Sequence, residues 1–464
     1  MPDEATPPTK SPPTPLELVK SKQYVALLVM GALAGIPVAV VAFYYLKAVA
    51  QGQKYFFTTL PNELGFRGAP VWWPLPILTL CGLIVGATLR YLPGSGGHNP
   101  ADGFAMGGSF GPKDLPSVVV ASLATLILGG VLGPEMPLVV IGMILAVLIV
   151  HLIKKDAPKQ AVTVIGAAGS FAAISSLLGS PLVGAFLLLE AAGIGGGLIS
   201  VILLPGLVAS GVGALVFVAL SDATATGVTS FGVPGLPKIG FPTGSQFAWS
   251  IVIGLVAAVI GTALRRMALQ IQPFVARHKM LVTPVLGLII GGLAVLFAEE
   301  TGKSSHFVLF SGQSGLAPLV QHAATWSVGA LLLLVVCKGL AYSASMGGFK
   351  GGPVFPGLFI GATIGMAFSH LPGLPLVDSV AMGMGAMSVV SMGGLPLSSV
   401  LLTLVFIQSD AFEVVSVVIL AVAVSFVASA WLERWLRPPA PSLTPTMTVA
   451  TSPAPASERA QPAA

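Results

Sequence analysis

The sequence predicts an all-α polytopic membrane protein built from short, tilted and broken helices. Of its 464 residues, 55% are hydrophobic and only 8% are charged, whereas soluble domains carry about 25% charged residues. Mean hydropathy is +0.92. The 56 glycines and 38 prolines are too many for plain spanning helices and favour interrupted or re-entrant ones with close backbone contacts. At roughly 20 residues per span, about ten or more passes fit.

Charge and ligand-forming residues exclude several classes of protein. The net charge is only +5, and no Lys/Arg-rich tract suggests nucleic acid. Cys81 and Cys337 lie in apolar runs, which indicates buried thiols rather than a disulfide or a metal site. The six His residues have no ligand spacing. We therefore predict no metal, no cofactor and no nucleic-acid partner.

Composition divides the chain into two membrane halves with polar ends. Residues 1–22 are polar and rich in Pro and Thr, and we expect a disordered cytoplasmic N-terminus without a secretory signal. The first membrane repeat is predicted at 23–220 and the second at 246–437. A Gly-, Thr- and Pro-rich linker loop at 221–245 separates them. Residues 438–464, rich in Pro, Ala, Ser and Thr, are predicted to form a disordered C-terminal tail.

Apolar runs define the membrane segments of the first repeat. We predict them at about 24–48, 72–90, 115–132, 137–153, 160–177, 181–192 and 196–220. The loop after the fourth segment carries Lys154, Lys155 and Lys159, and the positive-inside rule places this loop in the cytoplasm. A chain of this size without an appended soluble domain is typical of bacteria, so we expect a multi-pass protein of the cell inner membrane.

The second repeat has its own segments and echoes the first. We predict its membrane segments at about 247–271, 282–299, 325–345, 378–393, 396–408 and 412–436. One more apolar run ends near Phe368. Residues 175–189 resemble residues 390–404, because both place Gly, one residue and then Pro-Leu before a short apolar run. Residues 94–96 likewise resemble residues 311–315. Repeated halves with interrupted helices are typical of transport proteins, whose helix N-termini point at an anion near the membrane midplane.

Glu135 is the residue around which these segments are organised. It lies in Gly133-Pro134-Glu135-Met136-Pro137, between two apolar runs, where an ionised side chain costs roughly 3 kcal/mol or more. Pro137 suits the first turn of a helix, so we expect Glu135 just before a helix N-terminus, an end that binds anions. A removable carboxylate on an anion site would be a gate. The alternative is a protonated glutamate that acts as a structural hydrogen-bonding group.

A glycine-rich loop at 94–97 is the second candidate part of an anion site. Its Ser95 hydroxyl is a neutral hydrogen-bond donor. Neutral donors and helix dipoles suit a permeant anion, because full cations would hold the ion too tightly for it to leave. The alternative for this loop is a bare turn between membrane segments.

The order of these motifs resembles the CLC chloride channel and transporter family. The motifs are GSG near 94, GPEMP at 133, SPLVG with Glu190 at 180–190, SGQSG at 311 and GGPVFPGLFIGA at 351, and the resemblance covers roughly residues 24–436. It implies two inverted repeats of short helices and homodimers with one anion pore in each subunit. Family members are passive channels or proton-coupled exchangers, so the resemblance implies chloride, other small anions, protons and the lipid bilayer as partners.

The resemblance also implies roles for individual residues. Ser95 matches the family's pore serine in GSGxP, with Gly96 beside it, and Glu135 matches the gating glutamate in GREGP. Val354 and Phe355 fall in the GGxFxP stretch, whose backbone amides hold the anion.

Several positions depart from the family pattern around the anion. Pro134 replaces the Arg of GREGP, and Met136 replaces its second Gly. Pro353 removes one amide from the GGxFxP stretch.

Two further departures concern protons and the inner pore. Ala191 occupies the position of the internal proton-transfer glutamate of many exchangers. The pore tyrosine of the last helix has no match after Ala430, where Trp431 and Trp435 are the nearby aromatics.

These departures favour uncoupled conduction. The hypothesis is a non-enzymatic, voltage-gated-type chloride channel with passive conduction gated by the protonatable Glu135. The alternative is a proton-coupled chloride or fluoride exchanger with Glu135 and Glu190 as proton carriers, although Glu190 could also be a structural carboxyl near a helix end. A remote alternative is an intramembrane serine protease that uses Ser95 and His98. It is disfavoured because no His on a separate helix has an obvious orienting partner.

Two lysines need an interpretation of their own. Lys350 follows a Gly-Gly-Phe passage and is predicted to attract anions in a vestibule or to be an interfacial cation. Lys338 lies within an apolar run and is predicted to snorkel or to pair with a carboxylate.

Overall fold

The computed structural model describes residues 20–104, 110–193, 198–224, 232, 240–408 and 411–436. The predicted tail at 438–464, nearly all of the predicted N-terminal segment and most of the predicted linker loop lie outside the described residues. The predictions of disorder for these segments therefore stay predictions.

The described residues form helices and no strands, and nine of these helices are long and apolar enough to cross a membrane. The helices of the first half are α2 (Lys22–Lys54), α3 (Leu60–Glu63), α4 (Pro74–Tyr91), α5 (Leu115–Ile127), α6 (Glu135–Ile153), α7 (Lys159–Leu178), α8 (Pro181–Ala191) and α9 (Leu198–Ala223). A π-helical turn, Tyr55–Thr59, joins α2 to α3. The predicted all-α membrane fold class is confirmed.

The second half continues with α10 (Gly244–Arg277), α11 (Lys279–Thr301), α12 (Gln313–Gln321), α13 (Val328–Gly348), α14 (Val354–Phe368), α15 (Leu376–Ser391), α16 (Pro396–Ile407) and α17 (Ala411–Leu436). Four helices are apolar but too short to span alone: α8, α14, α15 and α16. They are the short helices that the Gly and Pro content predicted.

Several helix ends differ from the sequence prediction, and two of them, the end of α5 and the start of α6, lie close to the site. α5 ends at Ile127 instead of continuing to 132, because Gly129 adopts a φ of 102° that stops a right-handed helix. α6 begins at Glu135 with Pro134 as its N-cap, so Pro137 is its third residue. The expectation that Glu135 precedes the helix was therefore wrong by one position. Short α12 was missed, because residues 311–315 were interpreted only as the partner of the 94–96 loop.

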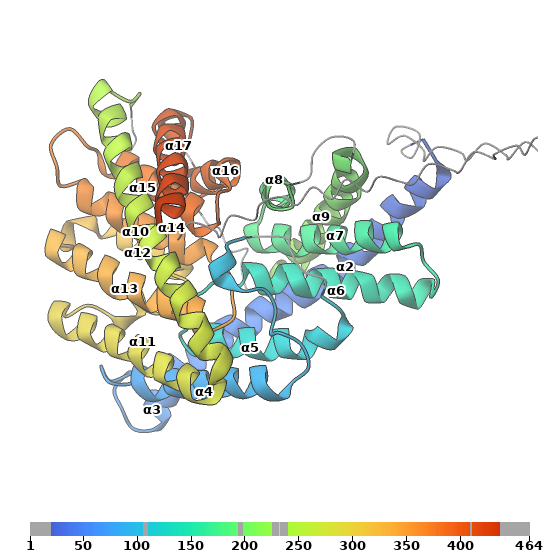
Figure 1. The fold of residues 1–464 in the computed structure, drawn as a ribbon, viewed down its shortest axis with the longest axis horizontal. Coiled ribbons are helices and arrows are strands. Elements are labelled where there is room, and N and C mark those ends of the chain that lie inside the picture. The colour runs from blue at the N-terminus through green and yellow to red at the C-terminus, as the bar shows by residue number, and fades with distance from the viewer. Residues whose placement is uncertain are drawn as a thin grey trace, which may run out of the picture.

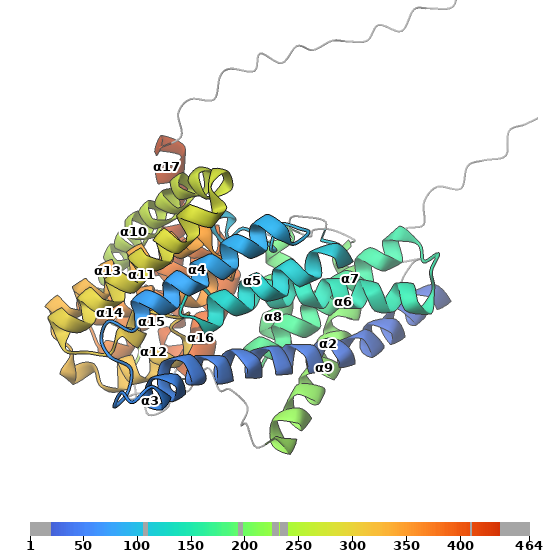
Figure 2. The same ribbon diagram turned by 90° about the horizontal axis from the view of Figure 1, so that it is seen from below.

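The two halves lie side by side and are joined by helices that cross between them (Figure 1). α2, α6, α7 and α9 gather on one side, and α10 packs with α13, α15 and α17 on the other. α4 of the first half packs along α11 of the second (Figure 2). A Cβ on Gly287 would overlap the Leu78 carbonyl oxygen, so this close approach requires glycine.

Contacts at the helix termini define the two ends of the molecule. At one end, Gln53 of α2 donates to the Leu126 carbonyl at 2.8 Å, and Trp73 before α4 donates to the Phe56 carbonyl at 2.8 Å. At the other end of α4, Lys279 Nζ donates to the Leu89 carbonyl at 3.0 Å. The start of α2 therefore lies at the same end of the molecule as the end of α4.

Candidate anion site

The N-termini of α6 and α14, one from each half, meet head to head. The Gly133 N–H donates to the Gly352 carbonyl at 2.8 Å, and the Gly352 N–H donates to the Gly133 carbonyl at 2.6 Å. Two helix N-termini, each with a partial positive charge, are thereby held at one point. An anion placed there interacts favourably with both.

The two loops at this junction share the pattern Gly-Pro-x-x-Pro, at 133–137 and 352–356. Pro134 and Pro353 are the N-caps of their helices, with φ values of −81° and −89° and ψ values of −2° and −9°. Taken one at a time in the sequence, these prolines are two separate departures from the family pattern. They occupy matching places in the two halves, a signal that direct alignment of the two pentapeptides would have found.

The carboxylate of Glu135 lies against the N-terminus of α14. Its Oε1 accepts a hydrogen bond from the Phe355 N–H at 2.8 Å. The side chain is fully buried, and its Oε2 has no hydrogen-bond partner among the described residues. The carboxylate of Glu135, from the first half, thus binds the N-terminus of α14 in the second half. Its donor, the Phe355 amide, is one of the two amides predicted from the sequence to hold the anion.

Both glycines of the junction are needed for this approach. A Cβ on Gly133 or on Gly352 would overlap the carboxylate oxygens of Glu135. The backbone of both loops therefore contacts the Glu135 carboxylate directly, and only glycine at these two positions avoids a steric clash with it.

Tyr342 on α13 completes the surroundings of the junction. Its hydroxyl is buried and donates to the Pro353 carbonyl at 2.9 Å, and it interacts electrostatically with Glu135. Sequence reasoning missed this residue because it searched for a tyrosine on the last helix. The available signal was a tyrosine within an apolar span. Trp431 and Trp435, the aromatics considered instead, are 73% and 88% exposed.

Ser95 lies in a cavity of about 260 Å³ that we call the Ser95 cavity. Its polar lining includes Ser95, Asn99, Gln272, Lys279 and Lys350, and residues 346–349 complete one wall. The Ser95 hydroxyl donates to the Gly97 carbonyl at 3.2 Å. Glu135 and Phe355 do not line this cavity.

Lys350 gives the Ser95 cavity a positive charge. A Cβ on Gly96 would lie 3.3 Å from the Lys350 Cε, so the glycine loop packs on the stem of this lysine. Burial lowers the pKa of the Lys350 ammonium to about 8; nearby Asp102 opposes this shift and Lys279 reinforces it. The geometry favours the vestibule interpretation of Lys350.

A second cavity, of about 360 Å³, lies on the other side of the junction. We call it the Phe310 cavity, and it is lined by Leu132, Pro134, Phe310, Ser311 and Gln313 among others. Its polar side chains are neutral. Gln53 lines it too, so it lies at the opposite end of α4 from the Ser95 cavity.

Each of the two cavities is lined by residues from both halves of the chain. The Ser95 cavity combines residues 94–95 of the first half with residues 346–350, which lead to the second junction loop. The Phe310 cavity combines Ser311, Gln313 and Ser314 of the second half with Leu132 and Pro134 of the first. This reciprocal construction is what inverted repeats produce, and it leaves the junction between two cavities.

Lys338 neither snorkels nor pairs with a carboxylate, so both expectations were wrong. Its Nζ lies 3.0–3.2 Å from the four consecutive carbonyl oxygens of residues 307–310, which share its three N–H groups, and 4.5 Å from the centroid of the Phe359 ring. The lysine therefore holds the segment that ends at Phe310, a non-glycine residue with a φ of 60°.

Glu190 caps a helix. It accepts hydrogen bonds from the Leu397 N–H at 2.9 Å, the Ser398 N–H at 2.7 Å and the Ser398 hydroxyl at 2.6 Å. This is the N-terminus of α16, so Glu190 joins α8 of the first half to α16 of the second. The geometry favours the structural interpretation of Glu190 over the proton relay.

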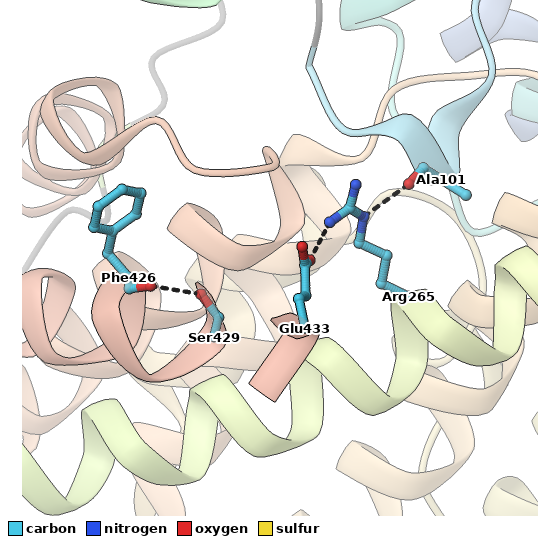
Figure 3. A network of polar contacts seen from close by, with 5 residues as sticks. All are labelled: Ala101, Arg265, Phe426, Ser429 and Glu433. Carbon is cyan, nitrogen blue, oxygen red and sulfur yellow. Dashed lines mark hydrogen bonds and ion pairs between the residues drawn. The ribbon is translucent and has the colours of Figure 1, made fainter. Parts of the chain in front are cut away.

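Arg265 ties three segments together near the Ser95 cavity (Figure 3). From α10 it donates to the Ala101 carbonyl at 2.9 Å and forms an ion pair with Glu433 of α17. In the same view, Ser429 donates to the Phe426 carbonyl at 2.9 Å within α17. The segment that follows the Ser95 loop is thus anchored to the last described helix.

The remaining predicted residues show no catalytic arrangement. Ser95 bonds to the Gly97 carbonyl and His98 Nε2 to the Gly103 carbonyl at 3.0 Å, so each is engaged with backbone rather than with the other. Within the described ranges, no group of three His, Cys, Asp or Glu side chains has a metal-ligand arrangement.

Comparison with known proteins agrees with this architecture. YfeO, a protein named for ion transport, is 28% identical over 362 residues in Escherichia coli strain SMS-3-5, covering 76% of this chain and 82% of YfeO. YfeO of Escherichia fergusonii matches to the same extent. Among solved structures, a slow cyanobacterial Cl⁻/H⁺ antiporter superimposes with a TM-score of 0.69 at 18% identity, covering 88% of this chain and 94% of that one.

A CLC-type fluoride/proton antiporter has the same fold, with a TM-score of 0.66 and 20% identity over 87% of this chain and 96% of its own. The family model described as voltage gated chloride channel matches residues 81–430, which is most of the membrane part. The chain therefore belongs to the voltage-gated chloride channel family, the CLC family.

Proposed function

We propose that this protein conducts chloride passively across the membrane and that Glu135 is its gate. The observation that carries the proposal is the hydrogen bond from the Phe355 N–H to Glu135 Oε1, inside a buried junction between two cavities. The carboxylate takes the place of a permeating anion at the N-terminus of α14. Protonation removes its charge, and with it the attraction that keeps the side chain in this place.

The amides of Val354 and Phe355 then become the site for chloride. Pro353 has no N–H, so these two residues supply the first donors of α14. Neutral amides bind a monovalent anion weakly enough for it to leave, as conduction requires. Lys350 and Lys279 attract anions into the Ser95 cavity, and the neutral polar groups of the Phe310 cavity receive them on the other side.

A proton-coupled exchanger is the second candidate. Two of the solved structures with this fold are named as proton antiporters, one with chloride and one with fluoride. Glu135 could carry a proton at the junction. An inner carrier is less evident, because Ala191 cannot titrate and Glu190 is held by three donors. Tyr342 is the titratable hydroxyl beside the junction.

Flux in liposomes separates the two candidates. Purified protein is reconstituted in chloride-loaded vesicles, and chloride efflux and external pH are recorded together, with a potassium shunt and with or without a proton ionophore. A channel gives efflux that needs only the shunt and moves no protons. Protons driven uphill by a chloride gradient would instead establish the exchanger.

Orientation follows from the charges at the two ends. Residues 20–24 and 154–159 carry five lysines at the end of the molecule that holds the Ser95 cavity. The opposite end carries Lys54, Glu63, Arg67, Glu299, Glu300 and Lys303, which balance. The positive-inside rule then places the Ser95 cavity at the cytoplasmic face, in the cell inner membrane of a bacterium. Protease accessibility of the loop at 154–158 in inside-out vesicles tests this.

A homodimer is the proposed assembly, as the family resemblance implies. Leu182 on α8, Leu215 on α9 and Leu397 on α16 are 62%, 74% and 48% exposed. Large apolar side chains on these neighbouring helices suit a second copy of the chain. Light scattering of the detergent-solubilised protein, with cysteine cross-linking at Leu215, distinguishes a dimer from a monomer covered by lipid.

A further inference from the structure

A third cavity, of about 270 Å³, lies apart from the anion site between the first turns of α2 and α7 and the last turn of α6. We call it the Lys154 cavity. It shares no lining residue with the Ser95 or Phe310 cavities. Because it adjoins the start of α2, it lies at the basic end of the molecule.

The lining of the Lys154 cavity changes from polar to apolar with depth. Its polar residues lie at the helix ends: Ser21, Gln23, Lys154 and Gln160. Further into the helices the lining is apolar: Ala26, Leu27, Met30, Val150, Val164 and Val201. Tyr24 and Ala161 lie between the two zones, in the first turns of α2 and α7. A phospholipid has the same order of chemistry along its length, with a polar headgroup above an acyl chain.

The mouth of the cavity is positively charged. Residues 20–24 and 150–164 contain five lysines and a single carboxylate, Asp156. The N-terminus of α7 adds to this potential, because its N-cap is Pro158 and no side chain caps its first N–H groups. A phosphate would meet Lys154 and this helix end together.

We propose that the Lys154 cavity binds an anionic phospholipid. The headgroup phosphate lies between Lys154 and the first turn of α7, and one acyl chain follows the apolar lining formed by α2, α6, α7 and α9. Charge complementarity and the depth order of the lining both select a lipid over a free anion, since a free phosphate uses only the mouth. Basic pockets between membrane helices are suited to such headgroups.

Native mass spectrometry of the purified full-length protein tests this site. The protein is titrated in detergent with dioleoylphosphatidylglycerol or with dioleoylphosphatidylcholine. We expect preferential retention of phosphatidylglycerol, an approximately fivefold weaker affinity in Lys154→Gln, and an unchanged affinity in Lys54→Gln, an exposed lysine at the opposite end. Ala161→Phe, which narrows the cavity beside the first turn of α7, should weaken binding of both lipids.

Several results would overturn the proposal. Equal retention of the two lipids would remove the headgroup site, and displacement by excess inorganic phosphate would identify a free-anion site. Absence of any retained lipid in the wild type would remove the lipid site altogether. Chloride flux of Lys154→Gln should match that of the wild type, which verifies folding and separates this site from the gate.

Discussion

Glu135 and Glu190 are both carboxylates of the first half that bind the N-terminus of a helix in the second half, yet they are held very differently. Glu190 is held by three donors on α16 and is partly exposed. Glu135 of α6 is fully buried against α14, accepts a hydrogen bond from the Phe355 N–H, also interacts with the Val354 amide, and keeps Oε2 without a hydrogen-bond partner among the described residues. The first arrangement is a stable cap.

The second arrangement is suited to removal. A buried carboxylate oxygen without a partner is costly when ionised, so a proton or a competing anion can displace the group with little net loss. The comparison teaches that position at a helix N-terminus does not define a gate. We expect burial and the unpartnered oxygen of Glu135 to decide whether its carboxylate stays.

Glu135→Gln should have the largest effect. The amide has the same shape but cannot ionise, and a hydrogen bond to a charged group contributes about 1.5–3 kcal/mol. We expect chloride flux at neutral pH to rise about tenfold and its acid activation to disappear. Efflux from liposomes at neutral and acidic pH measures both. If the wild-type pH dependence survives, Glu135 is not the gate.

Gly352→Ala should open the gate by steric displacement. The added Cβ overlaps the Glu135 carboxylate, so we expect higher flux at neutral pH and a loss of about 1–3 kcal/mol in the free energy of unfolding. Gly292→Ala is the matched control, because a Cβ at Gly292 in α11 meets nothing within 4 Å. Flux and thermal unfolding of both variants are compared. Equal behaviour of the two would mean that the close approach to Glu135 has no role.

Lys350→Met tests the charge of the Ser95 cavity. Because burial lowers the pKa of Lys350 to about 8, its charge is present below that pH and is lost as pH rises through it. In a Glu135→Gln background, chloride flux should therefore fall about threefold across this range, and Lys350→Met should remove that step. A step of unchanged size in the double variant would assign it to another group.

Tyr342→Phe should shift the gate without abolishing it. Loss of the hydrogen bond to the Pro353 carbonyl loosens the first turn of α14, so its hold on the ionised Glu135 weakens. Acid activation should then begin at a pH up to about one unit higher. Tyr45→Phe is the matched control, a buried tyrosine that donates to Ser122 at 2.7 Å away from the junction. An identical shift in both variants would indicate a general loss of packing.

Glu190→Gln should have the smallest effect on flux. Removal of the charge weakens the cap of α16, and we expect a loss of about 1–2 kcal/mol in the free energy of unfolding with an unchanged pH profile. Thermal unfolding and liposome flux measure the two effects. If Glu190→Gln instead abolished coupled proton movement, Glu190 would be a relay and the comparison with Glu135 would fail.

The sequence by itself determined the helices and the identity of the gate candidate. Apolar run length and the positions of Gly and Pro are local signals, and they placed most ends of the long apolar segments within a few residues, whereas short α12 was missed. A carboxylate between two apolar runs is equally local, so Glu135 could be nominated without coordinates. Motif order also identified the family.

Only the tertiary structure decided which helix receives each carboxylate. Local reasoning assigned Glu135 to its own helix, whereas its donor is Phe355, 220 residues away, and the donors of Glu190 are 207 and 208 residues away. The role of Tyr342 depends in the same way on how α13 packs against the junction. Pairings at such separations are set by the packing of the two halves, and periodicity within a segment carries no information about them.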